Sequence, residues 1–413
     1  MKKVAIYAFV IFLVTISYTL INQYVFGRKY VFATPSSFRG DSLYNPYQSI
    51  NTANVKIANF HAHAKNGLLN GKGEPSDVLN QYKKIGVDIA GVSQYNSIEQ
   101  SLIETGSSIP VYEHGINFGK THQLVIGARQ VVYKDYPFFQ TLHNKQEILE
   151  RISLDTQNAI ALTHPDLSHG YSISDIKNLH YYDLIEVLSP FANSIAYWDT
   201  ALTAGKPIFA IGNDDVHDVF DHNELGRFLN IIYCDSISNE KVVQALKKGH
   251  SAVLWLKQET DESLADKLEK ISSAKNIFKS LTVDNDTINL KFERSIQQLD
   301  VIIDNGIRYA TLSQDSSYKI LLKPEHSYLR FEASLTNGSK IIFNPVFRNS
   351  GSAVISRKDL AKANVVRNSN DTFLGASFLF ICIALSQFFV KLSSKLRGKR
   401  RKKDFIFNNL QQS

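Results

Sequence analysis

The chain has 413 residues, 44% hydrophobic and 21% charged, which is long enough for one large globular domain with additional segments. Its net charge of +7 comes from its ends, because Lys2, Lys3 and the basic stretch 391–403 supply the excess and leave the rest slightly acidic. Nucleic-acid-binding domains usually carry a basic face, so we expect no nucleic-acid partner. The only cysteines are Cys234 and Cys382, which excludes a cysteine metal cluster.

Two apolar segments, 4–21 and 373–390, contain no charged residue and are each about as long as a membrane-spanning helix must be. A basic tail, 391–413, follows the second segment, and by the positive-inside rule it is cytoplasmic. These features predict a two-pass cell-membrane protein with both termini cytoplasmic and its main domain outside, periplasmic or on the outer face. A cleaved signal peptide is the alternative for 4–21, but no small-x-small cleavage site follows it, which favours an anchor.

Residues 30–54 are rich in Ser, Asn, Tyr and Pro and are predicted to form a linker. From residue 55 to 258, short apolar runs alternate with segments of helical periodicity. Strands are predicted at 55–60, 88–93, 109–116, 123–128, 159–163, 184–188, 207–211, 229–233 and 251–256. Helices are predicted at 75–85, 96–105, 145–155, 174–179, 194–204 and 239–248.

Short buried strands separated by helices indicate parallel pairing with helices outside. About seven such units in about 200 residues favour a β/α barrel over an open sheet. After a polar helical stretch at 259–275, the pattern changes to alternating runs with Asn-Gly at 305–306 and 337–338. Asn-Gly between such runs is a strong hairpin signal, so 278–350 is predicted to be a small antiparallel β domain.

Several histidines occur where the predicted strands begin or end. His61 and His63 follow the first strand, His122 directly precedes the strand at 123–128, and His164 follows the strand at 159–163. Asp215 and His217 follow the strand at 207–211. The carboxyl ends of parallel barrel strands share one mouth, so these side chains are expected to form one cluster.

The cluster is chemically suited to metal binding. Neutral imidazole nitrogens and carboxylate oxygens favour divalent Zn, Mn or Fe. Two or more neighbouring ions can bind a phosphate and activate water for in-line attack. Each residue alone is more often a packed or exposed side chain, and only their combined placement favours a metal site.

These residues resemble the PHP (polymerase and histidinol phosphatase) family. Asn59-Phe-His-Ala-His63 is similar to the family's first motif, His164-Pro165 to its mid-barrel His-Pro, and Asp215-Val-His217 to its closing Asp-x-His. The resemblance implies a distorted seven-unit β/α barrel that hydrolyses phosphomonoesters or phosphodiesters with two or three metal ions. It also implies six metal ligands: His61, His63, His122, His164, Asp215 and His217.

The sequence departs from the family at three places. The family's Thr-Asp-His falls on Ser93-Gln-Tyr95, its Ser-Asp-Gly falls near Lys65-Asn-Gly67, and the Glu that usually bridges two metals falls on Asn117. An amide cannot offset the charge of two cations as a carboxylate does. The additional candidate ligands are Glu113, His114, Asn117 and Glu186. We therefore expect one to three divalent ions, with a full three-metal centre in doubt.

Two functions follow. The first is a metal-dependent phosphoesterase that uses a metal-activated water on a small phosphorylated substrate outside the cytoplasm. The second is a catalytically degenerate barrel that binds a ligand or partner at the membrane. The surviving ligand cluster favours the enzyme, since a barrel does not need such a set to fold. The lipid bilayer is an expected partner, and the sequence identifies no protein partner.

Overall fold

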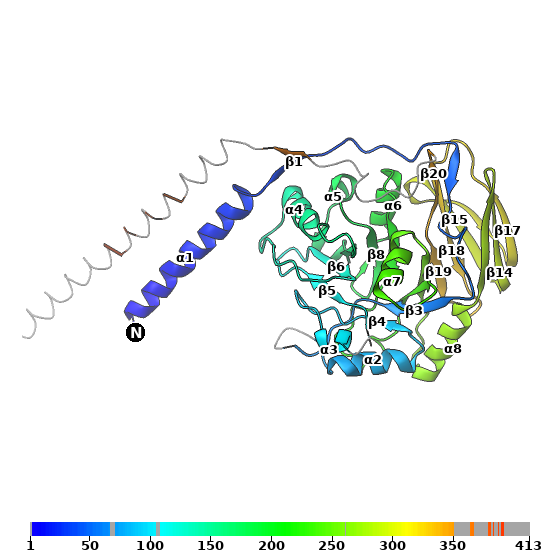
Figure 1. The fold of residues 1–413 in the computed structure, drawn as a ribbon, viewed down its shortest axis with the longest axis horizontal. Coiled ribbons are helices and arrows are strands. Elements are labelled where there is room, and N and C mark those ends of the chain that lie inside the picture. The colour runs from blue at the N-terminus through cyan, green and yellow to red at the C-terminus, as the bar shows by residue number, and fades with distance from the viewer. Residues whose placement is uncertain are drawn as a thin grey trace, which may run out of the picture. The chain divides into compact units, whose positions relative to one another are not determined.

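A computed structural model describes residues 2–66, 71–104, 108–260, 262–350 and 364–366, with single positions between 379 and 391 (Figure 1). The chain divides into two compact units, one of residues 1–31 with 365–413 and the other of residues 32–364. In the first unit lies α1 (Lys2–Tyr24), and β1 (Lys29–Val31) pairs with β21 (Asn364–Val366).

Among the described residues, one helix is long and apolar enough to cross a membrane, the Tyr7–Tyr24 part of α1. A signal sequence has the same properties, so this finding fits either interpretation of the N-terminal segment. The predicted span 373–390 and the basic tail 391–413 lie for the most part outside the described residues.

The second unit is a mixed α/β structure built on two large sheets. One has the strand order β10-β8-β7-β6-β5, with β9 paired to β8. The strands of this sheet are β5 (Val111–His114), β6 (His122–Ile126), β7 (Ala159–Thr163), β8 (Leu184–Ser189), β9 (Ala192–Asn193) and β10 (Phe209–Gly212).

The other large sheet has the order β16-β15-β18-β19-β12-β11-β3-β4, with β20 paired to β18 and β2 to β20. The strands are β2 (Ser42–Tyr44), β3 (Val55–Asn59), β4 (Ile89–Ala90), β11 (Phe228–Tyr233), β12 (Ser251–Trp255), β15 (Gln298–Ile303), β16 (Ile307–Leu312), β18 (Tyr328–Ser334), β19 (Lys340–Phe343) and β20 (Val346–Asn349). Strands from the predicted barrel and from the predicted β domain therefore share one sheet. The predicted linker also contributes its strand β2 to that sheet.

A smaller sheet completes the second unit, with β14 (Thr287–Ile296) between β13 (Phe278–Asp284) and β17 (Asp315–Leu321). Its strands alternate buried and exposed residues, as expected of a sheet with one solvated face. Asn305 and Gly306 adopt positive φ angles of 63° and 70° in the turn between β15 and β16, so this Asn-Gly signal marks a real hairpin.

The two large sheets meet to form a ring of strands around the candidate site. Between β4 and β5, Tyr95 and Glu113 form an isolated parallel bridge. Between β10 and β11, the buried Asn230 side chain takes the place of a backbone ladder. Its oxygen accepts from Gly212 N at 3.0 Å and its amide donates to Gly212 O at 2.7 Å.

The expected all-parallel pairing is wrong for much of this ring. β7 and β10 are parallel to β8, and β3 is parallel to β4. β6, however, is antiparallel to both β5 and β7, and β11 is antiparallel to both β3 and β12. The loop at 115–121 is too short for a helical crossover, so β5 and β6 pair as a hairpin. Apolar run length alone does not reveal strand direction.

Helices cover the outside of the ring in Figure 1. The helices of this unit are α2 (Pro75–Lys84), α3 (Gln100–Glu104), α4 (Leu142–Ile152), α5 (Ile173–Asn178), α6 (Ile195–Thr203), α7 (Asn239–Lys247) and α8 (Leu264–Lys275), with short 3₁₀ turns at Leu167–His169 and Asp304–Gly306. Four of these helices begin with a capping box, for example that of Ser263 with Asp266 at α8. Gly86 follows α2 with φ 81°, as its predicted capping role requires.

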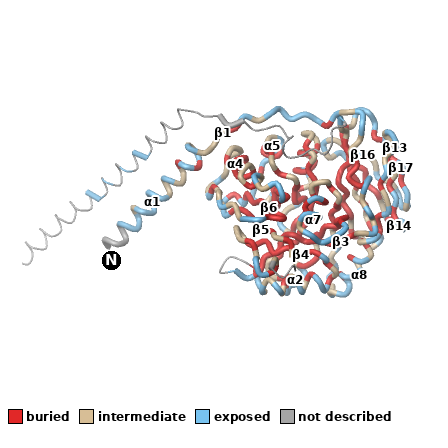
Figure 2. Tube along the Cα trace, in the orientation of Figure 1, coloured by how far each residue is buried: buried red, intermediate tan, exposed pale blue. Residues whose placement is uncertain are grey.

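The core follows the strands, which Figure 2 shows in red inside a partly exposed shell. All residues of β6, β7, β8, β10 and β11 are buried. Strands buried on both faces read as continuous apolar runs, and for this reason the sequence locates them well.

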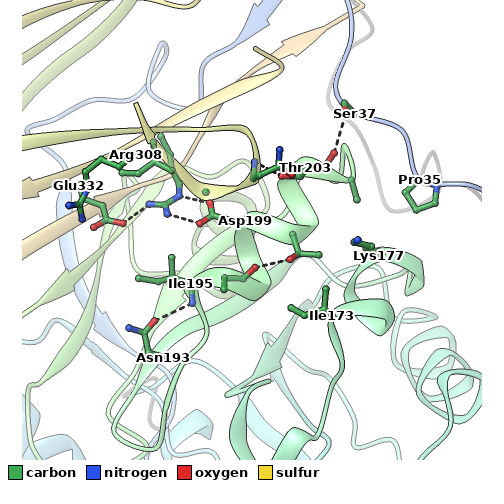
Figure 3. A pocket seen from close by; sticks show the side chains of 17 residues that line it. Pro35, Ser37, Ile173, Lys177, Asn193, Ile195, Asp199, Thr203, Arg308 and Glu332 are labelled. Carbon is green, nitrogen blue, oxygen red and sulfur yellow. Dashed lines mark hydrogen bonds and ion pairs between the residues drawn. The ribbon is translucent and has the colours of Figure 1, made fainter. Parts of the chain in front are cut away.

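A buried ion pair links α6 to β18. The Arg330 guanidinium donates two hydrogen bonds of 2.8 Å to the two carboxylate oxygens of Asp199, and a third of 2.6 Å to Glu332. The guanidinium also lies 5.0 Å from the Trp198 ring centre. Figure 3 shows Asp199 and Glu332 at the wall of a cavity of about 940 Å³, and the linker residue Ser37 also lines this cavity.

We expect Asp199→Ala to lower the free energy of unfolding by about 3–5 kcal/mol, because it leaves the Arg330 charge buried without its bidentate partner. The measurement is denaturant unfolding followed by tryptophan fluorescence, because Trp198 lies beside the guanidinium. The control is Glu293→Ala, which breaks the exposed Lys279–Glu293 pair at 3.4 Å and should cost about 0–1 kcal/mol. Equal losses in the two variants would contradict this account.

Candidate metal centre

Ligand-type side chains from six strands or their ends meet inside the ring. His61 and His63 follow β3, Glu113 is the third residue of β5, and His122 is the first residue of β6. The remaining members are His164 directly after β7, Glu186 in β8, and Asp215 and His217 after β10. All of them except His217 are buried.

Glu113 lies at the centre of this cluster and is fully buried. Its Oε1 is 2.7 Å from His122 Nδ1 and 3.3 Å from His164 Nε2. Its Oε2 is 3.4 Å from His61 Nε2 and 3.3 Å from His63 Nε2. The two oxygens of one carboxylate therefore face two different pairs of imidazoles.

Asp215 approaches one of these pairs from the opposite side. Its Oδ1 is 3.0 Å from His61 Nε2 and 3.1 Å from His63 Nε2. His217 lies at the edge of the cluster, with its side chain 40% exposed and its Nδ1 2.9 Å from the Asp215 carbonyl oxygen. Because a carbonyl only accepts, His217 Nδ1 carries the proton and Nε2 is left as its ligand atom.

The donor atoms fit a metal centre better than a hydrogen-bonded network. Two groups have ligand atoms within 4.8 Å of one another: His61, Glu113 and His164, and His61, His63 and Asp215. His61 Nε2 and Glu113 Oε2 are buried and make no hydrogen bond of acceptable geometry, although they are only 3.4 Å apart. Buried polar atoms normally find partners, so atoms that converge without bonding indicate a shared cation.

The electrostatics of the cluster are dominated by its burial and its opposite charges. Burial disfavours the charged form of His61, but the carboxylates of Asp215, Glu186 and Glu113 outweigh it and raise the His61 pKa well above its usual value. Burial likewise disfavours ionised Glu113, but His122 and His61 hold the Glu113 pKa well below its usual range. A divalent cation competes with the imidazole protons, because histidine binds metal only as the neutral ring.

Two ligands lie on strained backbone. His164 and Asp215 have φ angles of 31° and 46°, a region that residues with a Cβ rarely occupy. In the same mouth, Ser168 and His169 also have positive φ angles, of 51° and 53°. Such strain gathers at functional sites, where the surrounding structure fixes a side-chain direction that relaxed backbone would not give.

Glu186 makes hydrogen bonds to two of the candidate ligands, His61 and His164. Its Oε1 lies 3.0 Å from His61 Nδ1 and accepts from the Asn213 amide at 2.9 Å, while its Oε2 accepts from His164 N at 2.9 Å. With Nδ1 donating to this carboxylate, His61 presents its unprotonated Nε2 to the centre. Orientation of a ligating histidine by an outer carboxylate is common at metal sites.

Two of the sequence candidates lie outside the cluster. His114 alternates with Glu113 along β5, so it faces away and contacts Gln123 and the Lys134 carbonyl. Asn117 closes its own loop, donating to Thr121 O at 3.0 Å and accepting from Thr121 N at 2.8 Å. The structure therefore places the candidate ligands His114 and Asn117 outside the cluster and Glu113 at its centre.

Sequence reasoning missed two contributors. Tyr95 stacks on His63 with ring centres 4.8 Å apart and meets His122 edge-on at 5.7 Å. Asp214 accepts from the backbone N–H groups of Gly226, Arg227 and Phe228, and from Tyr82 Oη. Burial raises the Asp214 pKa to about 6, and its bonds fix the loop that carries Asp215. Tyr95 stood in the sequence at a family ligand position, which was its only signal.

No family model matches this chain, and no curated protein matches it either. Two solved structures are similar in fold. A two-domain protein containing a predicted PHP-like metal-dependent phosphoesterase from Bacteroides vulgatus is 12% identical, and the alignment covers 81% of this chain and 99% of that one with a TM-score of 0.39. PsfC from Pseudomonas syringae is 16% identical over 54% of this chain and 97% of its own, with a TM-score of 0.36.

We expect Glu113→Gln to reduce the metal content of the purified chain by at least one ion, because the variant loses the carboxylate whose two oxygens face the two pairs of imidazoles. Elemental analysis gives the stoichiometry, and a thermal melt of the same sample checks folding. Asn117→Ala is the matched control, since Asn117 only closes its loop, and it should keep the wild-type content. Loss of metal in Asn117→Ala but not in Glu113→Gln would reverse the assignment.

Glu186→Gln should keep the ligands but weaken metal affinity about 10- to 100-fold, the usual effect of losing an outer carboxylate. The amide is isosteric, so packing around His61 is retained while the negative charge behind its Nδ1 is lost. Competition with a chelator of known affinity measures the change. An unaltered affinity would show that Glu186 serves folding alone.

Proposed function

We propose that the chain is a metal-dependent phosphoesterase with a centre of two divalent ions, and that Glu113 would contribute to holding both. One ion would be held by His61, His63 and Asp215, and the partly exposed His217 would be a further ligand for it. The other would be held by His122 and His164. The observation that carries the proposal is the division of the two Glu113 oxygens between two pairs of imidazoles.

Divalent ions in such a centre polarise phosphoryl oxygens and make water a better nucleophile at neutral pH. The residues of this chain position the reactants. His217 and Tyr95 are the two partly exposed side chains in contact with His63, so they line the approach to the centre. Burial, followed by the charges of Glu113 and Asp215, raises the pKa of the Tyr95 hydroxyl well above its usual value, so this side chain stays neutral beside the centre.

The donor set is imidazole and carboxylate, which suits Zn, Mn or Fe. The substrate class proposed is a phosphomonoester or phosphodiester, attacked in line by water with departure of the ester oxygen. A third ion has fewer donors available, because Gln94 and Tyr95 stand where the sequence comparison expects Asp and His.

We also propose that α1 is retained as an anchor and that 373–390 is a second span, with both termini cytoplasmic. The basic tail supports this orientation by the positive-inside rule. The second unit would then act on its substrate outside the cytoplasm. A measurement of turnover together with metal content distinguishes this enzyme from a barrel that only binds a ligand.

The full chain in detergent, supplied with Mn or Zn, should hydrolyse bis(p-nitrophenyl) phosphate or p-nitrophenyl phosphate. Asp215→Asn should lose ions and reduce turnover by about 100-fold or more, as removal of a central electrostatic group does. Asp235→Asn is the control, since Asp235 is exposed after β11 and should leave both unchanged. Two bound ions without turnover on either ester would favour the binding function, and unchanged metal in Asp215→Asn would refute the site.

A further inference from the structure

Exposed apolar side chains lie at the mouth of the metal centre. The loop 115–121 joins the two site residues Glu113 and His122, and it carries Ile116 and Phe118, which are 58% and 68% exposed. Phe139 is 70% exposed, and its ring centre lies 6.5 Å from that of Phe118. These three side chains form one apolar projection directly beside the site.

Two more mouth loops add exposed rings. Phe191 follows β8, is 52% exposed, and meets His217 edge-on at 6.0 Å between ring centres. Phe220 is 51% exposed in the loop that begins with Asp215 and His217. We call these five side chains the apolar rim: Ile116, Phe118, Phe139, Phe191 and Phe220.

The projection is held by specific bonds. Phe118 N donates to Pro137 O at 3.0 Å, and Ile116 N donates to Asp135 Oδ2 at 2.8 Å. Thr121 Oγ1 ties the end of the loop to Gly170 O at 3.0 Å, on the loop that follows His164. The backbone is thus organised to present apolar side chains to the outside, and such exposure marks an interaction surface.

The chemistry of the surface favours a lipid bilayer over a protein groove. The exposed rings lie on separate loop tips, and Lys120, also exposed, is on the same loop as Phe118. Within 115–121 and 133–140 the charged residues are Lys120, Lys134 and Asp135, and the Asp135 carboxylate accepts from backbone N–H groups. The loop that carries Phe220 differs, because Asp218 and Asp221 flank that ring. The projection at Phe118 and Phe139, with its adjacent lysines, matches an interface of acyl chains and anionic headgroups, and α1 is apolar enough to hold the chain at a membrane.

We propose that the apolar rim inserts into the bilayer interface and presents the metal centre to phosphate esters of lipid headgroups. The substrate class rests on the proposed phosphoesterase function. The membrane contact does not depend on catalysis and is therefore testable without turnover.

The test uses the full chain in liposomes with an environment-sensitive fluorophore on a single introduced cysteine, in a Cys382→Ala background that keeps the buried Cys234. Labels at Phe118→Cys and Phe139→Cys should be quenched by lipids carrying nitroxide at a shallow acyl position. Leu154→Cys is the control, because Leu154 is 74% exposed but precedes β7, at the opposite end of that strand from the mouth. We expect quenching about threefold or more stronger at the rim than at 154.

Equal or absent quenching at the rim and at 154 would overturn the proposal. Energy transfer between donor- and acceptor-labelled chains at 118, without lipid quenching, would mean that a second copy covers the rim and would also overturn it. Metal content measured on the same samples separates the two proposals. Rim quenching in a chain that binds no metal leaves the membrane contact standing and refutes only the phosphoesterase.

Discussion

The structure of the ring depends on the burial of Glu113 and Asp215 among histidines. Removing two carboxylates from water costs several kcal/mol each unless opposite charge or metal compensates for it. Here the compensation comes from imidazoles on β3, β6 and the end of β7, so the strands must approach one another at fixed register for the carboxylates to be tolerated. Backbone strain at His164 and Asp215 is the cost of aiming these side chains at a common centre.

The direction of β6 explains how His122 reaches that centre. In an all-parallel barrel, a residue that precedes its strand lies at the end opposite to the mouth. Because β6 is antiparallel to β7, His122 pairs with Thr163, the residue directly before His164. The hairpin therefore brings a residue from the beginning of one strand beside residues from the ends of others, and the same hairpin carries the loop that bears Phe118.

Apolar runs and histidine placement predicted much of this from the sequence. The runs at 159–163 and 184–188 gave strands at nearly the observed positions, since strands buried on both faces leave a continuous apolar signature. Strand direction was not predictable, because a run of apolar residues is the same in both directions. The part played by Glu113 was uncertain for a related reason. Only the alternation along β5, once the strand is fixed, shows that Glu113 faces inward while His114 faces Gln123.

Buried amides and carboxylates next to the candidate ligands hold the centre in place. Asn230 joins β10 to β11, Asn213 bonds Glu186, and Asp214 fixes the loop of Asp215. None of them is a candidate ligand, and no pattern in the sequence selects them, because a buried Asn or Asp looks like any other until its partners are known. Their hydrogen bonds fix the strands and the loop that carry the candidate ligands.

Charge balance argues for an anionic substrate at this centre. Glu113, Asp215 and Glu186 bring three negative charges, and the imidazoles are neutral when they bind metal. Two divalent cations would bring four positive charges and leave the buried centre with an excess of about one, which a phosphate ester offsets when its anionic oxygens enter. A third cation would raise the excess to about three without an added carboxylate, because Asn117 is an amide that closes its own loop. In the proposed two-ion centre, these three carboxylates would therefore favour a ligand that carries its own negative charge.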